Sequence, residues 1–401
     1  MKKFFSNPCN RYFFLWTLFN LKGFLYQDGS IINQSILMLI MLISMYEIIN
    51  FFKTIKTNSS TFFRSLNYII LMYTVYGLIL LITDGTTVFS QYGDPYSSIS
   101  FTASVWIILI PIYVTYLYTV QGYLRLNMLQ KWMVVFVLIG IIQFYTFQHQ
   151  MMTLFLEQGS NRTEAQNGAG YILLSIIPGM LVYKRKLFSY FGIAICIAFI
   201  IMAMKRGAIL ISAIALLLII VRDFKTASNA NKFAVFGLVL IGLVMLFNFV
   251  ESMMETSDYF NARIEATLEG DSSGRDIIYQ KYWNTYLYDS NFFQWAVGRG
   301  AMSTLKYGNI YAHNDWIEIL FCHGFVGLLI FMNFWKRLFI ESRSPYRSEP
   351  SRFCLFLLFS IFFLKSFFSM SIVGMPIYAT TMMGFALADG FNEHCSYLRS
   401  K

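Results

Sequence analysis

The stretch that decides the fold runs from residue 312 to residue 335 and reads AHNDWIEILFCHGFVGLLIFMNFW. Its part from Trp316 to Trp335 is mostly apolar, and about 20 apolar residues cross a bilayer as a helix. A polar segment, 251–312, precedes it, so His313 and Asp315 stand where a loop meets a predicted membrane span. A histidine and a carboxylate at this boundary suit proton transfer at the water-facing end of a helix.

Similar apolar runs recur along the chain. Hydrophobic residues make up 57% of the sequence, charged residues 13%, and the mean hydropathy is +0.54, whereas roughly a quarter of the residues of a soluble protein are charged. We therefore predict an all-α polytopic membrane protein with about twelve spans. Whether the first, sixth and eighth of these cross the membrane completely is left open. The predicted spans are 11–26, 31–52, 66–82, 101–119, 132–148, 170–183, 187–204, 207–221, 233–250, 316–335, 353–370 and 375–391.

Basic residues are distributed unevenly between the predicted loops. The loops 27–30, 83–100 and 149–169 hold Arg162 as their single basic residue, whereas the loops that alternate with them are rich in Lys and Arg. The positive-inside rule then places both termini in the cytoplasm and the segment 251–312 on the outer face, as one large loop within a single membrane domain, 1–401. The net charge of +10 follows from this bias, so it predicts contact with anionic lipids and no nucleic-acid partner.

The histidines and cysteines give no sign of a metal site. The chain has 4 His and 5 Cys, and they are scattered without the spacing of zinc ligands or of a disulfide framework. The sequence therefore predicts neither a metal nor another cofactor.

Two basic residues lie where a pair of predicted spans meets at the outer face. They are the first two residues of Lys205-Arg206-Gly207-Ala208, between the spans 187–204 and 207–221. Two cations beside a glycine can bind a phosphate group through charge-assisted hydrogen bonds. The alternative is that both side chains reach to lipid headgroups.

Three more cations belong to the same side of the membrane. Arg275 and Arg299 each follow a glycine in the large loop, where backbone amides can also turn toward an anion. The alternative for Arg275 is pairing with Asp271 or Asp276. Lys365 lies near the outer end of a predicted span, where an ammonium group should face a cavity or a counter-ion.

Several cations and one histidine at a membrane face suit a lipid-linked diphosphate as substrate. The arginines would stabilise the charge that develops on the leaving diphosphate, and a neutral His313 would accept a proton from an incoming hydroxyl group. Alternatively, His313 pairs with Asp315 or a backbone group at the start of its helix, or Asp315 and Glu318 orient or replace the base. The predicted catalytic residues are Arg206, Arg275 and His313, and the predicted substrate-binding residues are Lys205, Arg299, Asn314, Asp315 and Lys365.

Three of these patterns resemble those of one protein family. His313 is followed after ten residues by Gly324, which is similar to the His-x(10)-Gly signature of the O-antigen ligase and polymerase superfamily, the Wzy/WaaL-type integral membrane glycosyltransferases. Residues 205–208 resemble the family's Ser-Arg-Gly-Ala helix start, with Lys205 in place of the small hydroxyl residue. Residues 273–275 resemble the family's loop arginine, with the following aromatic at Tyr279 or Trp283.

The resemblance implies a GT-C-like protein of the bacterial inner membrane with its active site on the periplasmic face. It implies metal-independent, inverting transfer of an undecaprenyl-diphosphate-linked glycan to a hydroxyl group of an acceptor glycan or glycolipid, with a chain-length regulator protein as a further partner. We expect a repeat-unit polymerase of O-antigen or capsule, because the short outer loops lack a basic cluster for a phosphorylated core oligosaccharide. A ligase that delivers the glycan to lipid A-core, and a transporter of lipid-linked sugars or polysaccharides, stay open as alternatives.

Overall fold

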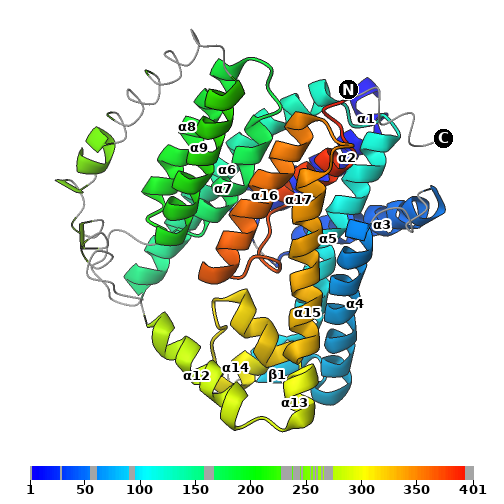
Figure 1. Cartoon of the computed structure of the whole chain (residues 1–401), viewed down its shortest axis with the longest axis vertical. Helices are drawn as coiled ribbons and strands as arrows, with labels where there is room; N and C mark the ends of the chain where they lie inside the picture. The colour runs from blue at the N-terminus through cyan, green and yellow to red at the C-terminus, as the bar shows by residue number, and fades with distance from the viewer. Residues whose placement is uncertain are drawn as a thin grey trace.

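The computed structural model describes residues 2–27, 29–54, 61–89, 95–157, 167–226 and 274–392, with scattered positions between 237 and 265. This part of the chain is a bundle of α-helices with one small antiparallel sheet, in which β1 (Thr87–Phe89) pairs with β2 (Pro95–Ser97). The predicted all-α class is confirmed apart from this short hairpin (Figure 1).

The helices follow the apolar runs of the sequence closely. Their bounds are α1 (Lys2–Phe5), α2 (Pro8–Asn20), α3 (Ile31–Thr54), α4 (Thr61–Asp84), α5 (Ser98–Val120), α6 (Leu126–Glu157), α7 (Ala169–Met180), α8 (Lys186–Met202), α9 (Arg206–Thr226), α12 (Arg275–Tyr288), α13 (Phe292–Val297), α14 (Ser303–Gly308), α15 (Asp315–Arg343), α16 (Glu349–Phe368) and α17 (Ile377–Leu387). Figure 1 shows α12, α13 and α14, which belong to the predicted large loop, gathered at one end of α4 and α15.

Seven helices within the described ranges are long and apolar enough to cross a membrane, namely α3, α4, α5, α6, α9, α15 and α16. This confirms a polytopic membrane protein. The predicted spans 170–183, 187–204 and 375–391 correspond to the shorter apolar helices α7, α8 and α17, and the first predicted span overlaps α2, which has 13 residues. The predicted span 233–250 falls mostly outside the described residues, so the count of twelve stays a prediction.

Helix α15 is not the single straight span that the sequence predicts. Gly324 has φ 65° and ψ −163°, which is not helical, and it divides α15 into a short limb, 315–323, and a long limb, 325–343. The rings of Trp316 and Phe331 lie 4.9 Å apart, although residues 15 apart would be separated by about 22 Å along a straight helix. The short limb therefore folds back along the long limb and brings the start of α15 to the level of Phe331.

A close approach between two backbones stabilises this bend. A Cβ atom on Gly324 would lie 2.4 Å from the backbone nitrogen of Gly298, so neither segment can carry a side chain at this contact. The N–H groups of residues 299 and 300 donate to the carbonyl groups of residues 321 and 322, at 3.0 Å each. These are the last carbonyls of the short limb, where helical partners run out. The glycines around Arg299 thus serve the fold of α15.

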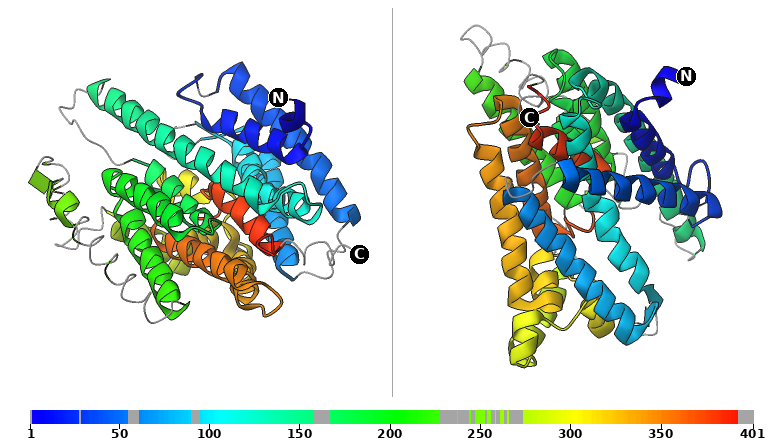
Figure 2. Two further views of the ribbon diagram at one scale, coloured as in Figure 1. Left: turned by 90° about the horizontal axis from the view of Figure 1, so that it is seen from above. Right: turned by 90° about the vertical axis from the view of Figure 1, so that its right-hand side faces the viewer.

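The C-terminal helix α17 lies inside the bundle. All of its residues are buried, and it packs against α5, α7 and α16. Figure 2 shows α17, in red, enclosed by its neighbours. An apolar helix of this length needs no lipid contact, because the surrounding helices cover its whole circumference.

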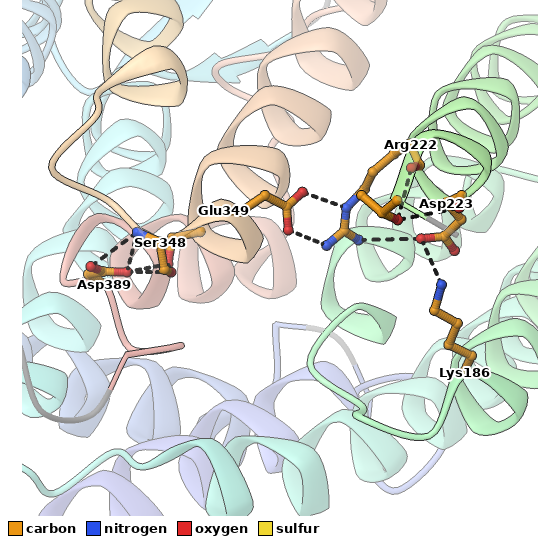
Figure 3. A network of polar contacts seen from close by, with 8 residues as sticks. Lys186, Arg222, Asp223, Ser348, Glu349 and Asp389 are labelled. Carbon is orange, nitrogen blue, oxygen red and sulfur yellow. Dashed lines mark hydrogen bonds and ion pairs between the residues drawn. The ribbon is translucent and has the colours of Figure 1, made fainter. Parts of the chain in front are cut away.

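The N-terminal end of α16 is held by polar contacts (Figure 3). Arg222, near the end of α9, donates two hydrogen bonds of 2.8 Å to Glu349 in the first turn of α16. Asp389, beyond α17, accepts hydrogen bonds from the hydroxyl groups of Ser348 at 2.7 Å and Ser351 at 2.6 Å. These contacts tie α16 to both neighbours at one end, and so position the opposite end of α16, around which the candidate site forms.

Candidate active site

The site is built around the C-terminal end of α16. A helix leaves its last carbonyl groups without partners inside the helix. At the end of α16, side chains from two other segments donate hydrogen bonds to the carbonyl groups of Phe367 and Phe368. The Arg275 guanidinium donates to the Phe368 carbonyl at 2.9 Å. The Phe367 carbonyl accepts from the Tyr279 hydroxyl at 3.3 Å and from the Asn314 amide at 3.4 Å. The loop helix α12 and the start of α15 therefore meet at the end of α16.

The junction between α8 and α9 reaches the same place. Helix α9 begins at Arg206, which is partly buried, and Lys205 precedes it. A Cβ atom on Gly207 would lie 2.4 Å from the Tyr171 hydroxyl oxygen and 3.3 Å from the Phe368 Cβ atom. Glycine lets the start of α9 pack this closely against α7 and α16. The predicted basic junction and the predicted loop arginine thus meet at Phe368, although they are far apart in the sequence.

His313 directly precedes α15 and has an unusual backbone. Its φ of 53° is left-handed, a conformation that costs roughly 1 kcal/mol for a residue other than glycine. The His313 carbonyl oxygen lies 3.3 Å from the Tyr279 hydroxyl, whose one proton is shared between this carbonyl and that of Phe367. On the other side, the Ala312 N–H donates to the Glu318 carboxylate at 2.8 Å. Asn314 caps α15 by accepting from the N–H two residues on, at 2.9 Å, so the backbone is held throughout this turn.

Partial burial and nearby positive charges both favour the neutral form of the His313 imidazole. The pKa of His313 is lowered from its ordinary value by partial burial first, then by the positive charges of Arg275 and Lys205. Both cations are therefore close enough to act on the imidazole. Burial raises the pKa of the Tyr279 hydroxyl, which stays protonated and able to donate. At neutral pH the site offers a proton acceptor among fixed positive charges.

Asp315 and Lys365 lie at the same end of the bundle and are almost fully buried. The Asp315 carboxylate accepts hydrogen bonds from the backbone N–H and the hydroxyl group of Ser371. The Lys365 ammonium donates to the Gly374 carbonyl at 2.8 Å and lies 4.9 Å from the centre of the Tyr171 ring. It is also within electrostatic range of Asp315 and Lys205. Both residues hold the segment between α16 and α17 in place, and their predicted contact with substrate stays a prediction.

Arg299 lies elsewhere in the loop. Its guanidinium donates to the backbone carbonyl of Asp289 at 2.7 Å, beyond the end of α12, and to the Ser290 hydroxyl at 3.2 Å. It also lies over the rings of Tyr307 and Phe321, at 5.7 and 5.5 Å. These contacts favour a structural role at the end of α12, so the predicted binding of substrate by Arg299 stays a prediction that its geometry does not support.

Some parts of the site have little or no signal in the sequence. Tyr279 lies four residues after Arg275 on α12, so the helical period places both on one face. The carbonyl groups of Phe367 and Phe368 and the ring of Tyr171 carry no signal of their own. Asp271, a predicted alternative partner of Arg275, lies outside the described residues.

Comparison with known proteins agrees with the predicted resemblance. Residues 191–332 match the model of the Wzy_C family, described as O-antigen ligase. The matched segment includes the basic junction, Arg275, His313 and Gly324, and therefore most of the residues that meet at the end of α16. A comparison with curated proteins gave no match. Residues 191–332 are thus similar to the Wzy_C family, and this match supports the predicted resemblance to the O-antigen ligase and polymerase superfamily of glycosyltransferase-like membrane enzymes.

Proposed function

We propose that this protein transfers a glycan from a lipid-linked diphosphate to a hydroxyl group of an acceptor glycan, as a repeat-unit polymerase. One observation carries the proposal: the imidazole of His313 lies within electrostatic range of Arg275 and Lys205, where α9, α12 and α15 meet the end of α16. A neutral base among fixed cations suits a reaction in which a hydroxyl loses a proton while a diphosphate gains charge.

The chemistry then divides between two groups of side chains. Lys205, Arg206 and Arg275 bind the diphosphate, and the positive end of α9 adds to their field. As the bond between the anomeric carbon and the diphosphate oxygen breaks, these cations stabilise the charge left on the diphosphate. The acceptor oxygen bonds to the anomeric carbon from the opposite face and gives its proton to His313, which inverts the anomeric configuration. Because side chains supply the positive charge, we propose that no metal ion takes part.

The membrane arrangement is part of the same proposal. The lipid-linked donor is an undecaprenyl diphosphate, the site opens on the periplasmic face of a bacterial inner membrane, and both termini are cytoplasmic. The uneven distribution of Lys and Arg between the loops supports this orientation. A chain-length regulator is the proposed protein partner.

A ligase reaction is the second candidate, because the matched family model is described as O-antigen ligase. The test is transfer by the purified protein from an undecaprenyl-diphosphate-linked repeat unit, with a second repeat unit or lipid A-core as acceptor, and with and without a chelator. We expect chain growth without lipid A-core and no effect of the chelator. Transfer to lipid A-core alone would establish a ligase. Transfer to neither acceptor would favour the transporter alternative.

The pH dependence of transfer should report the environment of His313. Transfer should decline at acidic pH as the imidazole becomes protonated, and the midpoint should lie below 6.5, the ordinary pKa of histidine. The variant Lys205→Gln removes one positive charge near the imidazole, so the midpoint should move upward. The measurement is the pH profile of kcat/KM in both proteins, because that profile reports the pKa of groups in the enzyme without bound substrate. The control is Lys306→Gln, which removes a cation paired with Asp84 at 2.6 Å and should leave the midpoint unchanged. A midpoint that does not move in Lys205→Gln would contradict the proposed effect of Lys205 on the His313 imidazole.

A further inference from the structure

Glu318 is a buried carboxylate that the proposed reaction does not use. It lies in the short limb of α15, and 5% of its surface is exposed. One carboxylate oxygen accepts from the Thr304 hydroxyl at 2.6 Å and from the Cys322 thiol at 3.5 Å, and the other accepts from the Ala312 N–H at 2.8 Å. Glu318 therefore joins three segments: α14, the residue before His313, and the short limb.

The turn that Glu318 holds is the one that carries His313. A left-handed conformation of a residue other than glycine persists only where its surroundings fix it. Here the N–H before His313 is bound by Glu318, and the His313 carbonyl is bound by Tyr279. Tyr279 and Asn314 tie the same turn to the end of α16. Glu318 supplies the contact at the residue before His313.

We propose that Glu318 is a positioning residue of the transfer reaction, which holds His313 in its left-handed conformation and so keeps the imidazole within electrostatic range of Arg275 and Lys205. This inference rests on the proposed role of His313 as base. The hydrogen bonds of Glu318 go to Thr304, Ala312 and Cys322, and none of them goes to the imidazole. Glu318 acts through the Ala312 N–H, to which one carboxylate oxygen is bound; the other oxygen is held by both Thr304 and Cys322, so the loss of Thr304 alone leaves Glu318 in place.

The hydrogen bonds that Glu318 accepts from Thr304 and Ala312 allow a matched set of variants. Glu318→Leu removes both acceptors. Glu318→Gln keeps an amide oxygen that can accept from the Ala312 N–H, and its amide group can donate to the Thr304 hydroxyl. Thr304→Val removes the hydrogen bond to α14 and leaves the contacts of Glu318 with Ala312 and Cys322. Thr304 is fully buried, so Thr304→Val should lower the stability of the protein while His313 keeps its position. This variant therefore controls for a general loss of stability.

The experiment measures kcat and KM for glycan transfer by the full-length protein and each variant. We expect Glu318→Leu to lower kcat by about 10- to 100-fold, because a displacement of the imidazole by about 1 Å can cost about 100-fold in rate. KM for the donor should change less than about threefold, because the arginines still bind the diphosphate. Glu318→Gln should restore most of kcat, and Thr304→Val should keep kcat within about threefold of the parent. Should Glu318→Leu not fold, Glu318→Met, of similar length and without a strong acceptor, takes its place.

A second readout does not depend on transfer. In protein labelled at its histidines, the NMR signal of His313, assigned with His313→Asn, should titrate closer to 6.5 in Glu318→Leu than in the parent, and should not change in Thr304→Val. Equal loss of kcat in Glu318→Leu and Thr304→Val, or a His313 titration that Glu318→Leu leaves unchanged, would overturn the proposal. If the parent transfers no glycan, the proposed function fails, and the titration still decides whether Glu318 positions His313.

Discussion

Replacing His313 by alanine is expected to lower kcat for glycan transfer by about 1,000-fold, within the range of about 10² to 10⁴ that a positioned base contributes. The imidazole is the neutral proton acceptor near the cations at the end of α16. Its loss therefore removes the base, while the cations that bind the diphosphate stay in place. KM for the lipid-linked donor should therefore change little. The measurement is steady-state transfer by purified parent and variant.

The control for this prediction is His149→Ala. His149 lies in α6 and is exposed, and it has no part in the contacts at the end of α16. Its replacement should leave kcat unchanged. If His313→Ala kept more than about a third of the parent's kcat, the group that accepts the proton would have to be another one.

Replacing Gly324 by alanine is expected to destabilise the protein by about 3 to 5 kcal/mol and to abolish transfer. The φ of 65° and ψ of −163° belong to a region open almost solely to glycine. In addition, the new Cβ atom would lie 2.4 Å from the Gly298 nitrogen and 2.6 Å from the Ala296 carbonyl. The bend can then form only with displaced neighbours, and a straighter α15 would carry His313 away from Arg275.

Thermal unfolding in detergent and transfer activity together test this second prediction. Gly122→Ala is the matched control, because Gly122 has a φ of 76° and a Cβ atom there would meet nothing within 4 Å. It should cost about 1 kcal/mol for the backbone conformation alone and leave transfer unchanged. Equal melting temperatures of the two variants would show that the contact with Gly298 does not matter for the fold.

The two glycine-flanked arginines show how far local sequence can predict a site. Arg275 and Arg299 look alike in the sequence, since each follows a glycine in the same loop. In the structure Arg275 begins α12 and binds the end of α16, whereas Arg299 binds backbone beyond the other end of α12. The flanking glycines do not distinguish them; the resemblance of residues 273–275 to the family's loop arginine favours Arg275, and the packing of α12 decides which arginine reaches the end of α16.

The sequence by itself determined the membrane class, the helical fold of most apolar runs, and the grouping of Lys205, Arg206, Arg275 and His313 as one candidate site. Apolar composition and glycine-flanked cations are local properties, so they can be read from the residues alone. Only the tertiary structure shows that α15 folds back at Gly324. It also shows that side chains of the candidate site donate hydrogen bonds to the carbonyl groups of Phe367 and Phe368. The bend exists because the backbone at Gly298 lies against it, and the carbonyls are available because α16 ends there. Both reasons involve segments far apart in the chain, which only packing brings together.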